Sequence, residues 1–104
     1  MAATYRVVVR AAAWRDVYKA AEYYENLDPD LALGFFDDFA RTSRRLETFP
    51  FVGREPYPSV RRQMLTTFPY FVYYRVAGRI VRIVAVLHSH GNPDDIRSTV
   101  GVRL

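Results

Sequence analysis

The chain has 104 residues, a length that predicts one domain (1–104) and no second one. Half of the residues are hydrophobic and a quarter are charged, which is ordinary for a globular protein, and no cysteine is present. Disulfides, a thiol nucleophile and thiolate zinc sites are therefore excluded.

The net charge of +4 is placed unevenly along the chain. Residues 1–52 carry seven basic and eight acidic side chains, whereas residues 53–104 carry eight basic and three acidic ones. A basic second half suggests an acidic partner, either a nucleic acid or an acidic protein segment. Neither a membrane span nor the apolar core of a signal peptide is evident in the sequence. We therefore expect a cytoplasmic protein that does not bind membranes.

The first half predicts a strand followed by two helices. Residues 4–10 are short and β-branched, as in a strand. From Ala11, apolar residues recur at helical spacing for about four turns, with Trp14 and Leu27 at the ends of the stripe. Asp28 is a favoured N-cap and Pro29 a favoured first residue for a second helix, which Pro50 ends. The short link predicts an antiparallel hairpin with Phe35, Phe36 and Phe39 in the core. Asp37, Asp38, Glu22 and Glu25 are predicted to lie on solvated helix faces.

The second half predicts a compact sheet. Residues 51–59 are expected to form a loop because of Gly53, Pro56 and Pro58. Strands are predicted at 60–67, 70–76 and 79–88, with Ala77-Gly78 as a tight turn, so neighbouring strands should be antiparallel. After Pro93, alternation of Val100, Val102 and Leu104 allows a last edge strand. The predicted fold class is α+β: an N-terminal strand, a two-helix hairpin and a three-to-four-stranded antiparallel sheet.

Several short segments in this order resemble a known family. They are Leu46-Glu47-Thr48-Phe49-Pro50 with Gly53, Val60-Arg61-Arg62, Phe68-Pro69-Tyr70, Val72-Tyr73-Tyr74-Arg75-Val76, Ile83-Val84-Ala85-Val86-Leu87-His88, and Asn92-Pro93. Together they resemble the RelE/ParE superfamily of bacterial type II toxin–antitoxin toxins, over about residues 5 to 97. The resemblance implies a cognate antitoxin whose acidic C-terminal segment folds onto the toxin, and it allows a heterotetramer with that antitoxin.

The superfamily contains two activities. RelE-like members are ribosome-dependent mRNA endoribonucleases, whereas ParE-like members inhibit DNA gyrase without a known hydrolytic site. Two arginines that the nuclease branch often carries fall on Tyr70 and Leu87 here. The sequence therefore favours a ParE-like gyrase inhibitor that is not an enzyme, with no cofactor and no metal. A RelE-like nuclease acting on mRNA at the ribosome remains the alternative, and a decayed toxin that serves only as a binding module is a third.

Four residues are candidates for catalysis if the chain is a nuclease. His88 and His90 could transfer protons, and Arg62 as the cation and Tyr74 complete the set. The simpler interpretation is that His88 ends a strand and His90 lies in a loop. No third ligand accompanies the two histidines, so no metal site is predicted.

Basic side chains of the predicted sheet are candidates for partner binding. The set is Arg61, Arg62, Arg75, Arg82 and His90. Because strand residues alternate, Arg61 and Arg62 should point to opposite faces. By the same rule, Phe71 and Tyr73 should share one face and Val72 and Tyr74 the other. The alternative role for these arginines is in solvated sheet edges and surface ion pairs.

Overall fold

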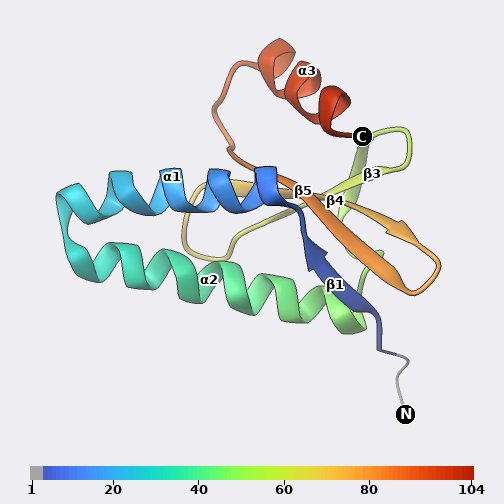
Figure 1. The fold of residues 1–104 in the computed structure, drawn as a ribbon, viewed down its shortest axis with the longest axis horizontal. Helices are drawn as coiled ribbons and strands as arrows, with labels where there is room; N and C mark the ends of the chain where they lie inside the picture. Colours follow the sequence, from blue (N-terminus) through green and yellow to red (C-terminus); the bar gives the residue numbers. More distant parts are fainter. Residues whose placement is uncertain (1–3) are drawn as a thin grey trace.

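The computed structural model describes residues 4–104, which form a sheet between a helix hairpin and a third helix (Figure 1). The elements are β1 (Arg6–Val9), α1 (Ala11–Leu27), α2 (Pro29–Thr48), β2 (Arg54–Tyr57), β3 (Val60–Met64), β4 (Tyr70–Ala77), β5 (Ile80–His88) and α3 (Pro93–Arg103). We call the side of the sheet that packs on α1 and α2 the hairpin face, and the other side the α3 face.

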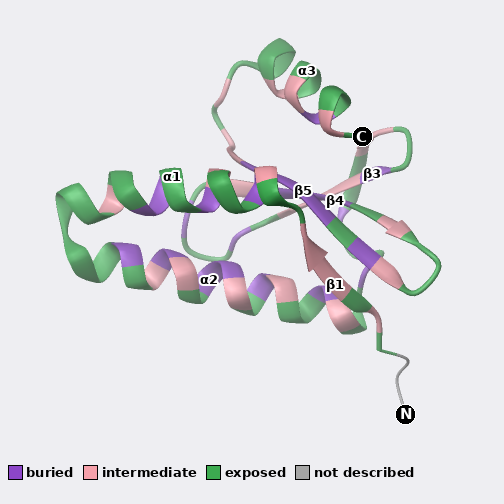
Figure 2. Ribbon diagram, in the orientation of Figure 1, coloured by how far each residue is buried: buried purple, intermediate pink, exposed green. Residues whose placement is uncertain are grey.

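Both predicted helices of the hairpin are confirmed. The Asp28 side chain accepts a hydrogen bond from the Asp30 N–H (2.9 Å), so it is the expected N-cap of α2. Phe35 and Phe39 are buried in the core, as predicted. Leu27, however, is 63% exposed, because it lies at the tip of the hairpin, which extends past the sheet (Figure 2).

The sheet has five strands in the order β1-β5-β4-β3-β2. The predicted antiparallel meander of β3, β4 and β5 is confirmed. The β4–β5 turn is displaced by one residue, since Ala77 pairs with Ile80 and Gly78 adopts a φ of +58°. The N-terminal strand β1 lies parallel to β5, which makes the sheet mixed.

Two predictions about irregular segments were wrong. The expected loop 51–59 contains β2, which pairs with β3 at the edge of the sheet, where proline is tolerated. The tail is the helix α3 and not an edge strand. Asn92 caps it by accepting hydrogen bonds from the N–H groups of Asp94 and Asp95, and Pro93 is its first residue. The alternation of Val100, Val102 and Leu104 did not mark a strand, since Val102 is 86% exposed.

Asp38 is the clearest correction to the predicted helix surfaces. Its side chain is fully buried and not solvated. It accepts hydrogen bonds from the N–H groups of Thr66 (3.0 Å), Thr67 (2.7 Å) and Phe68 (3.1 Å). The segment that follows β3 therefore turns around a helix carboxylate, and β3 ends at Met64 instead of Thr67.

A β-bulge in β5 lets this strand contribute to the cores on both sheet faces. Tyr73 pairs with Ala85 and Tyr74 pairs with Ile83, so Val84 is the extra residue. Val84 and Ala85 consequently both pack on the α3 face, with Tyr73 and Val100. The flanking residues Ile83 and Val86 pack on the hairpin face.

Candidate partner-binding surface

Arg61 and Arg62 point to opposite faces of the sheet, as predicted. The Arg61 guanidinium donates to the carbonyl of Gly53 (2.8 Å) and more weakly to that of Phe51 (3.3 Å). These bonds fix the loop before β2, so Arg61 has a structural role. Arg62 lies on the α3 face, with its guanidinium 4.2 Å from the ring centroid of Phe71.

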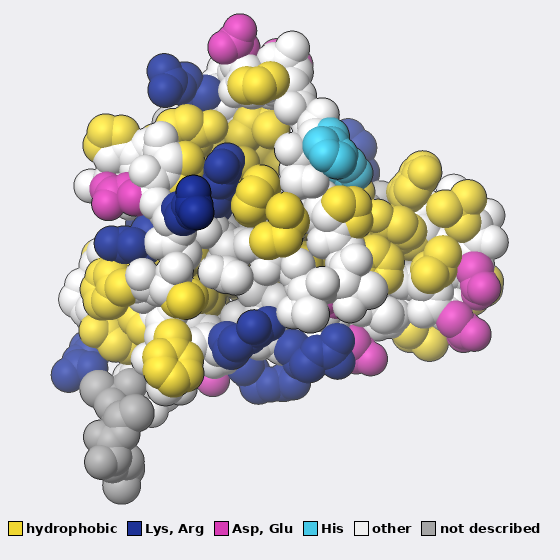
Figure 3. All heavy atoms as spheres, turned by 180° about the vertical axis from the view of Figure 1, so that it is seen from behind, with side chains coloured by type: hydrophobic (Ala, Val, Ile, Leu, Met, Phe, Trp, Pro, Cys, Tyr) yellow, Lys and Arg dark blue, Asp and Glu magenta, His cyan; other side chains and the backbone are white. Residues whose placement is uncertain are grey.

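Arginine and aromatic side chains alternate at this end of the α3 face. Arg62 covers Phe71, Arg97 of α3 lies 5.3 Å from the ring centroid of Tyr57, and Tyr57 stacks on Tyr73. Burial raises the pKa of Tyr73, and a hydrogen bond with Arg62 opposes that rise. Seen from behind, arginine and hydrophobic side chains lie side by side over the end of the sheet that carries β2 and β3 (Figure 3). Such a surface suits a partner with both apolar and acidic groups.

A second group of arginine side chains lies at the other end of the α3 face. Arg82 of β5 stands directly opposite Arg75 of β4 and pairs with Val8 of β1 on its other side. Arg10, Arg75 and Arg82 line one hollow of ≈ 280 Å³, together with Ala77, Val84, Arg103 and Leu104. We call Arg10, Arg75 and Arg82 the arginine triplet.

No acidic residue lines this hollow within residues 4–104. Its fourth arginine, Arg103, is paired with Asp16 through two nitrogen–oxygen contacts of 2.6 and 3.1 Å. All three arginines of the triplet are exposed. Like charges directly opposite on neighbouring strands are unfavourable, so an anion bound there would relieve their repulsion. Carboxylates and phosphates match guanidinium geometry best.

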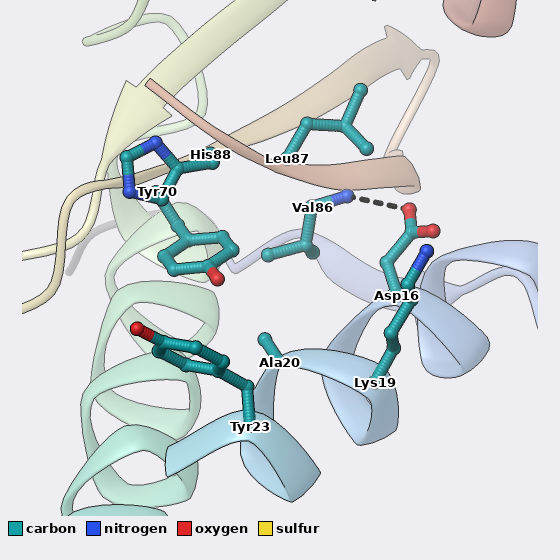
Figure 4. Close-up of a pocket in the computed structure, with 8 residues that line it drawn as sticks. All are labelled: Asp16, Lys19, Ala20, Tyr23, Tyr70, Val86, Leu87 and His88. Atoms are coloured by element: carbon teal, nitrogen blue, oxygen red, sulfur yellow. Dashed lines mark hydrogen bonds between the residues drawn. The ribbon is translucent and has the colours of Figure 1, made fainter. Parts of the chain in front are cut away.

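His88 and His90 lie on a different part of the molecule. His88 pairs with Tyr70, and the two rings make an edge-to-face contact at 5.1 Å. The His90 N–H donates to Nδ1 of His88 (3.0 Å). His88 borders a hollow of ≈ 330 Å³ between α1 and β5, which Tyr23, Tyr70 and Lys19 also line (Figure 4). This hollow opens on the hairpin side and not toward the arginine triplet.

The four residues of the nuclease alternative do not converge. Tyr74 is fully buried on the hairpin face, and its hydroxyl accepts a hydrogen bond from the Gly53 N–H (3.1 Å). Arg62 lies on the opposite face. Tyr74 and Tyr70 are four residues apart on β4, so His88, which pairs with Tyr70, is roughly 13 Å along the sheet from Tyr74. Within residues 4–104, no cluster of three or more metal-binding side chains is present, and no helix is long and apolar enough to span a membrane.

Two residues of this surface were missed by the sequence analysis. Arg10 was predicted only as the end of a strand. Residues 6, 8 and 10 point to the same face of the sheet as Arg82, so the two-residue period of a strand could have predicted the face on which Arg10 lies. Asp16 was not singled out, because it lies on the polar side of the predicted first helix. Instead it accepts from the Val86 N–H (2.9 Å) as well as from Arg103, a pairing of residues 87 positions apart that no local pattern reveals.

Known proteins resemble the chain in sequence and in fold. A family model described as the ParE toxin of type II toxin-antitoxin system, parDE, matches residues 7–93. A chain of the solved chromosomal ParDE TA system from P. aeruginosa has a TM-score of 0.74 and 22% sequence identity, and the match covers 84% of this chain and 98% of that chain. No curated protein sequence matches the chain. The family match runs from β1 to the first residue of α3.

Proposed function

Because the chain belongs to the ParE toxin family of type II toxin–antitoxin systems, we propose that it inhibits DNA gyrase and is held inactive by a cognate antitoxin. The match over residues 7–93 is the observation that carries this proposal, since it spans nearly the whole hairpin and sheet. A cytoplasmic location, where gyrase works, is part of the same proposal.

The arrangement of charge supports an acidic partner at the α3 face. The arginine triplet lacks acidic neighbours in its hollow, and Arg62, a partly buried residue, lies over the ring of Phe71. Of the arginines predicted to bind a partner, Arg75 and Arg82 suit this role best. Arg61 suits it least, because its guanidinium already bonds two carbonyl groups of its own chain.

The proposal is tested with purified toxin in gyrase supercoiling and cleavage-complex assays. Added toxin should slow supercoiling and raise the amount of cleaved DNA held on the enzyme, and stoichiometric antitoxin should restore normal activity. Unchanged gyrase activity with a large excess of folded toxin would refute the proposed target. Cleavage of mRNA in a translation reaction with the same toxin would favour the RelE-like alternative, which the separation of His88 from Tyr74 and Arg62 does not support.

A further inference from the structure

Four arginine side chains lie on the α3 face where β1 and β4 flank β5 (Figure 1). Arg75 of β4 stands opposite Arg82 of β5, and Arg82 pairs with Val8 of β1. Because strand residues two apart share a face, Arg6 and Arg10 lie on this face as well, on either side of Val8. We call Arg6 and the arginine triplet together the arginine row.

The four guanidinium groups of the row have no anionic partner within residues 4–104. All four residues are exposed, and none of them forms an ion pair or donates a side-chain hydrogen bond to the described chain. Arg103, which lines the same hollow, differs because it is already paired with Asp16. Like charges on neighbouring strands repel each other, and no group of the described chain offsets this repulsion. The row therefore suits an anion that another molecule supplies.

The spacing of the row suits an anion that carries several charges. Neighbouring strands are about 4.8 Å apart, so Arg75 and Arg82 start side by side across the sheet. Arg6 and Arg10 are four residues apart, which is about 13 Å along the direction of β1. One strand of duplex DNA carries a phosphate about every 3.4 Å of its axis, and the grooves are about 6 and 12 Å wide. A phosphate backbone can therefore meet several arginines of the row at once, whereas a small anion can meet only those at the hollow.

The lining of the hollow favours a nucleic acid over a protein surface. Besides its four arginines, the described residues that line it are Ala77, Val84 and Leu104, none of them aromatic. Protein interfaces are built around buried aromatic and apolar anchors. The α3 face offers such groups at its other end, around Phe71 and Tyr57. A site that offers arginines and little else takes its binding energy from charge, as contacts to a phosphate backbone do.

We propose that the arginine row binds the phosphate backbone of duplex DNA, so that the toxin contacts DNA itself when it acts on gyrase. The contact with gyrase-bound DNA rests on the proposed gyrase inhibition, whereas the DNA site itself rests on the row. Arg75 and Arg82 would hold one phosphate between them, and Arg10 and Arg6 would bind phosphates further along the backbone. An acidic antitoxin segment at the same arginines would exclude DNA, so the two partners would compete for the row.

The salt dependence of DNA binding tests the site directly. Antitoxin-free toxin is titrated into a short fluorescein-labelled duplex, and fluorescence anisotropy gives the affinity at several salt concentrations. Each phosphate contact contributes about −0.9 to the slope of log K against log salt concentration, so three to four contacts predict a slope of roughly −3 and a loss of about 60-fold between 50 and 200 mM salt. No binding by folded wild-type toxin at low salt would overturn the proposal.

Matched double variants show whether the row makes these contacts. Arg75→Gln combined with Arg82→Gln should weaken duplex binding at least tenfold at low salt and make the slope less steep by about 1.8, the share of two phosphates. Arg15→Gln combined with Arg41→Gln is the control, because it removes the same charge from exposed arginines of α1 and α2. The control should keep the wild-type slope. Equal slopes for the two double variants would overturn the proposal.

Gyrase with and without DNA separates a DNA contact from a protein contact. Biolayer interferometry gives the affinity of each double variant for gyrase alone and for the gyrase–DNA complex. The Arg75/Arg82 variant should match the control on gyrase alone and bind the gyrase–DNA complex at least tenfold more weakly than the control. An equal loss on gyrase alone would place the row against an acidic protein surface and overturn the DNA contact. Gyrase inhibition by a wild-type toxin that does not bind duplex DNA would overturn this inference and keep the proposed function, whereas DNA binding without any effect on gyrase would refute the proposed target and keep the DNA site.

Discussion

Arg103 of α3 and Asp16 of α1 form a two-contact ion pair at the edge of β5, just beyond the point where β1 ends. The same two side chains also bind the strand itself. Arg103 donates to the Val84 carbonyl (3.0 Å), and Asp16 accepts from the Val86 N–H (2.9 Å). The pair therefore satisfies two edge groups at the bulge and fixes α3 to the rest of the fold.

Removal of either partner of this pair should destabilise the protein by about 2 kcal/mol. This value lies between the losses typical of exposed and of buried ion pairs, because both side chains are only slightly exposed. Arg103→Met and Asp16→Asn, combined in a double-mutant cycle under urea denaturation, measure the coupling. Arg41→Met, on the exposed surface of α2, is the control and should stay within about 0.5 kcal/mol of wild type. A coupling energy near zero would show that the pair does not hold α3.

Asp38→Ala should be among the most destabilising substitutions on the helices, by about 3 kcal/mol or more, since it leaves three backbone N–H groups without their acceptor. Asp38→Asn keeps one acceptor oxygen and should cost less. The neighbouring Asp37 is exposed, so Asp37→Ala serves as the control. Thermal denaturation of the three variants checks the order, and equal midpoints for Asp38→Ala and Asp37→Ala would contradict it.

Tyr70 should make stability fall at alkaline pH. Burial first, and then the neighbouring Tyr24 and Tyr23, raise the pKa of Tyr70 to about 12 from its usual 10. The folded state keeps this proton while the unfolded state loses it, so the stabilising contribution is complete below pH 10 and declines as pH rises toward 12.

The Tyr70→Phe variant should therefore lose less stability than wild type between pH 9 and pH 11, as measured by urea denaturation at each pH. Tyr18→Phe, which removes a hydroxyl from a side chain that is 61% exposed, is the matched control. If the pH profiles of Tyr70→Phe and wild type run parallel, the Tyr70 hydroxyl does not contribute to the alkaline loss.

Gly53→Ala and Gly101→Ala should change stability in opposite directions. A Cβ atom at Gly53 would lie 2.5 Å from the Tyr74 hydroxyl and 2.6 Å from the Arg62 carbonyl oxygen, so we expect a loss of about 1–3 kcal/mol. A Cβ atom at Gly101 in α3 meets no atom within 4 Å, and the gain in helix propensity should stabilise by up to about 1 kcal/mol. Differential scanning calorimetry of the two variants checks the signs, and a stable Gly53→Ala protein would contradict the close approach.

Charge reversal within the arginine triplet should weaken antitoxin binding. Arg75→Glu and Arg82→Glu are each expected to lower affinity at least tenfold at 0.15 M salt, with a smaller difference at high salt because these groups are exposed and screened. Arg61→Gln is not a suitable control, since Arg61 fixes the loop at Gly53. Arg41→Glu, which changes an exposed arginine of α2 outside this hollow, is the control in titration calorimetry, and affinities of Arg75→Glu and Arg82→Glu equal to that of the control would rule out a role for the triplet.

Local chemistry predicted most of the elements. Asp28 and Pro29 mark the start of α2, and the apolar spacing around Phe35 and Phe39 gave its buried side correctly. The α3 helix was not predicted, although Asn92-Pro93-Asp94 is typical of a helix start, because the alternation of Val100 and Val102 suggested an edge strand. Neither the parallel pairing of β1 with β5 nor the burial of Asp38 has a local signal. Both depend on contacts between segments tens of residues apart, and the same is true of the arginine triplet, which combines residues of β4 and β5 with the residue that follows β1.

The bulge at Val84 also governs where β5 can change length. Deletion of Val84 or Ala85 would restore strict alternation and leave every other side chain of the strand on its present face. A deletion elsewhere in β5 would move the side chains on one side of the deletion to the opposite face of the sheet. Insertions and deletions among relatives should therefore concentrate at this point. In a relative whose strand lacks the extra residue, a sequence alignment without a gap would set one residue of that relative against Leu87. In space, that residue would occupy the position of His88. A comparison of site residues beyond the bulge must follow the faces of the sheet and not the count along the chain.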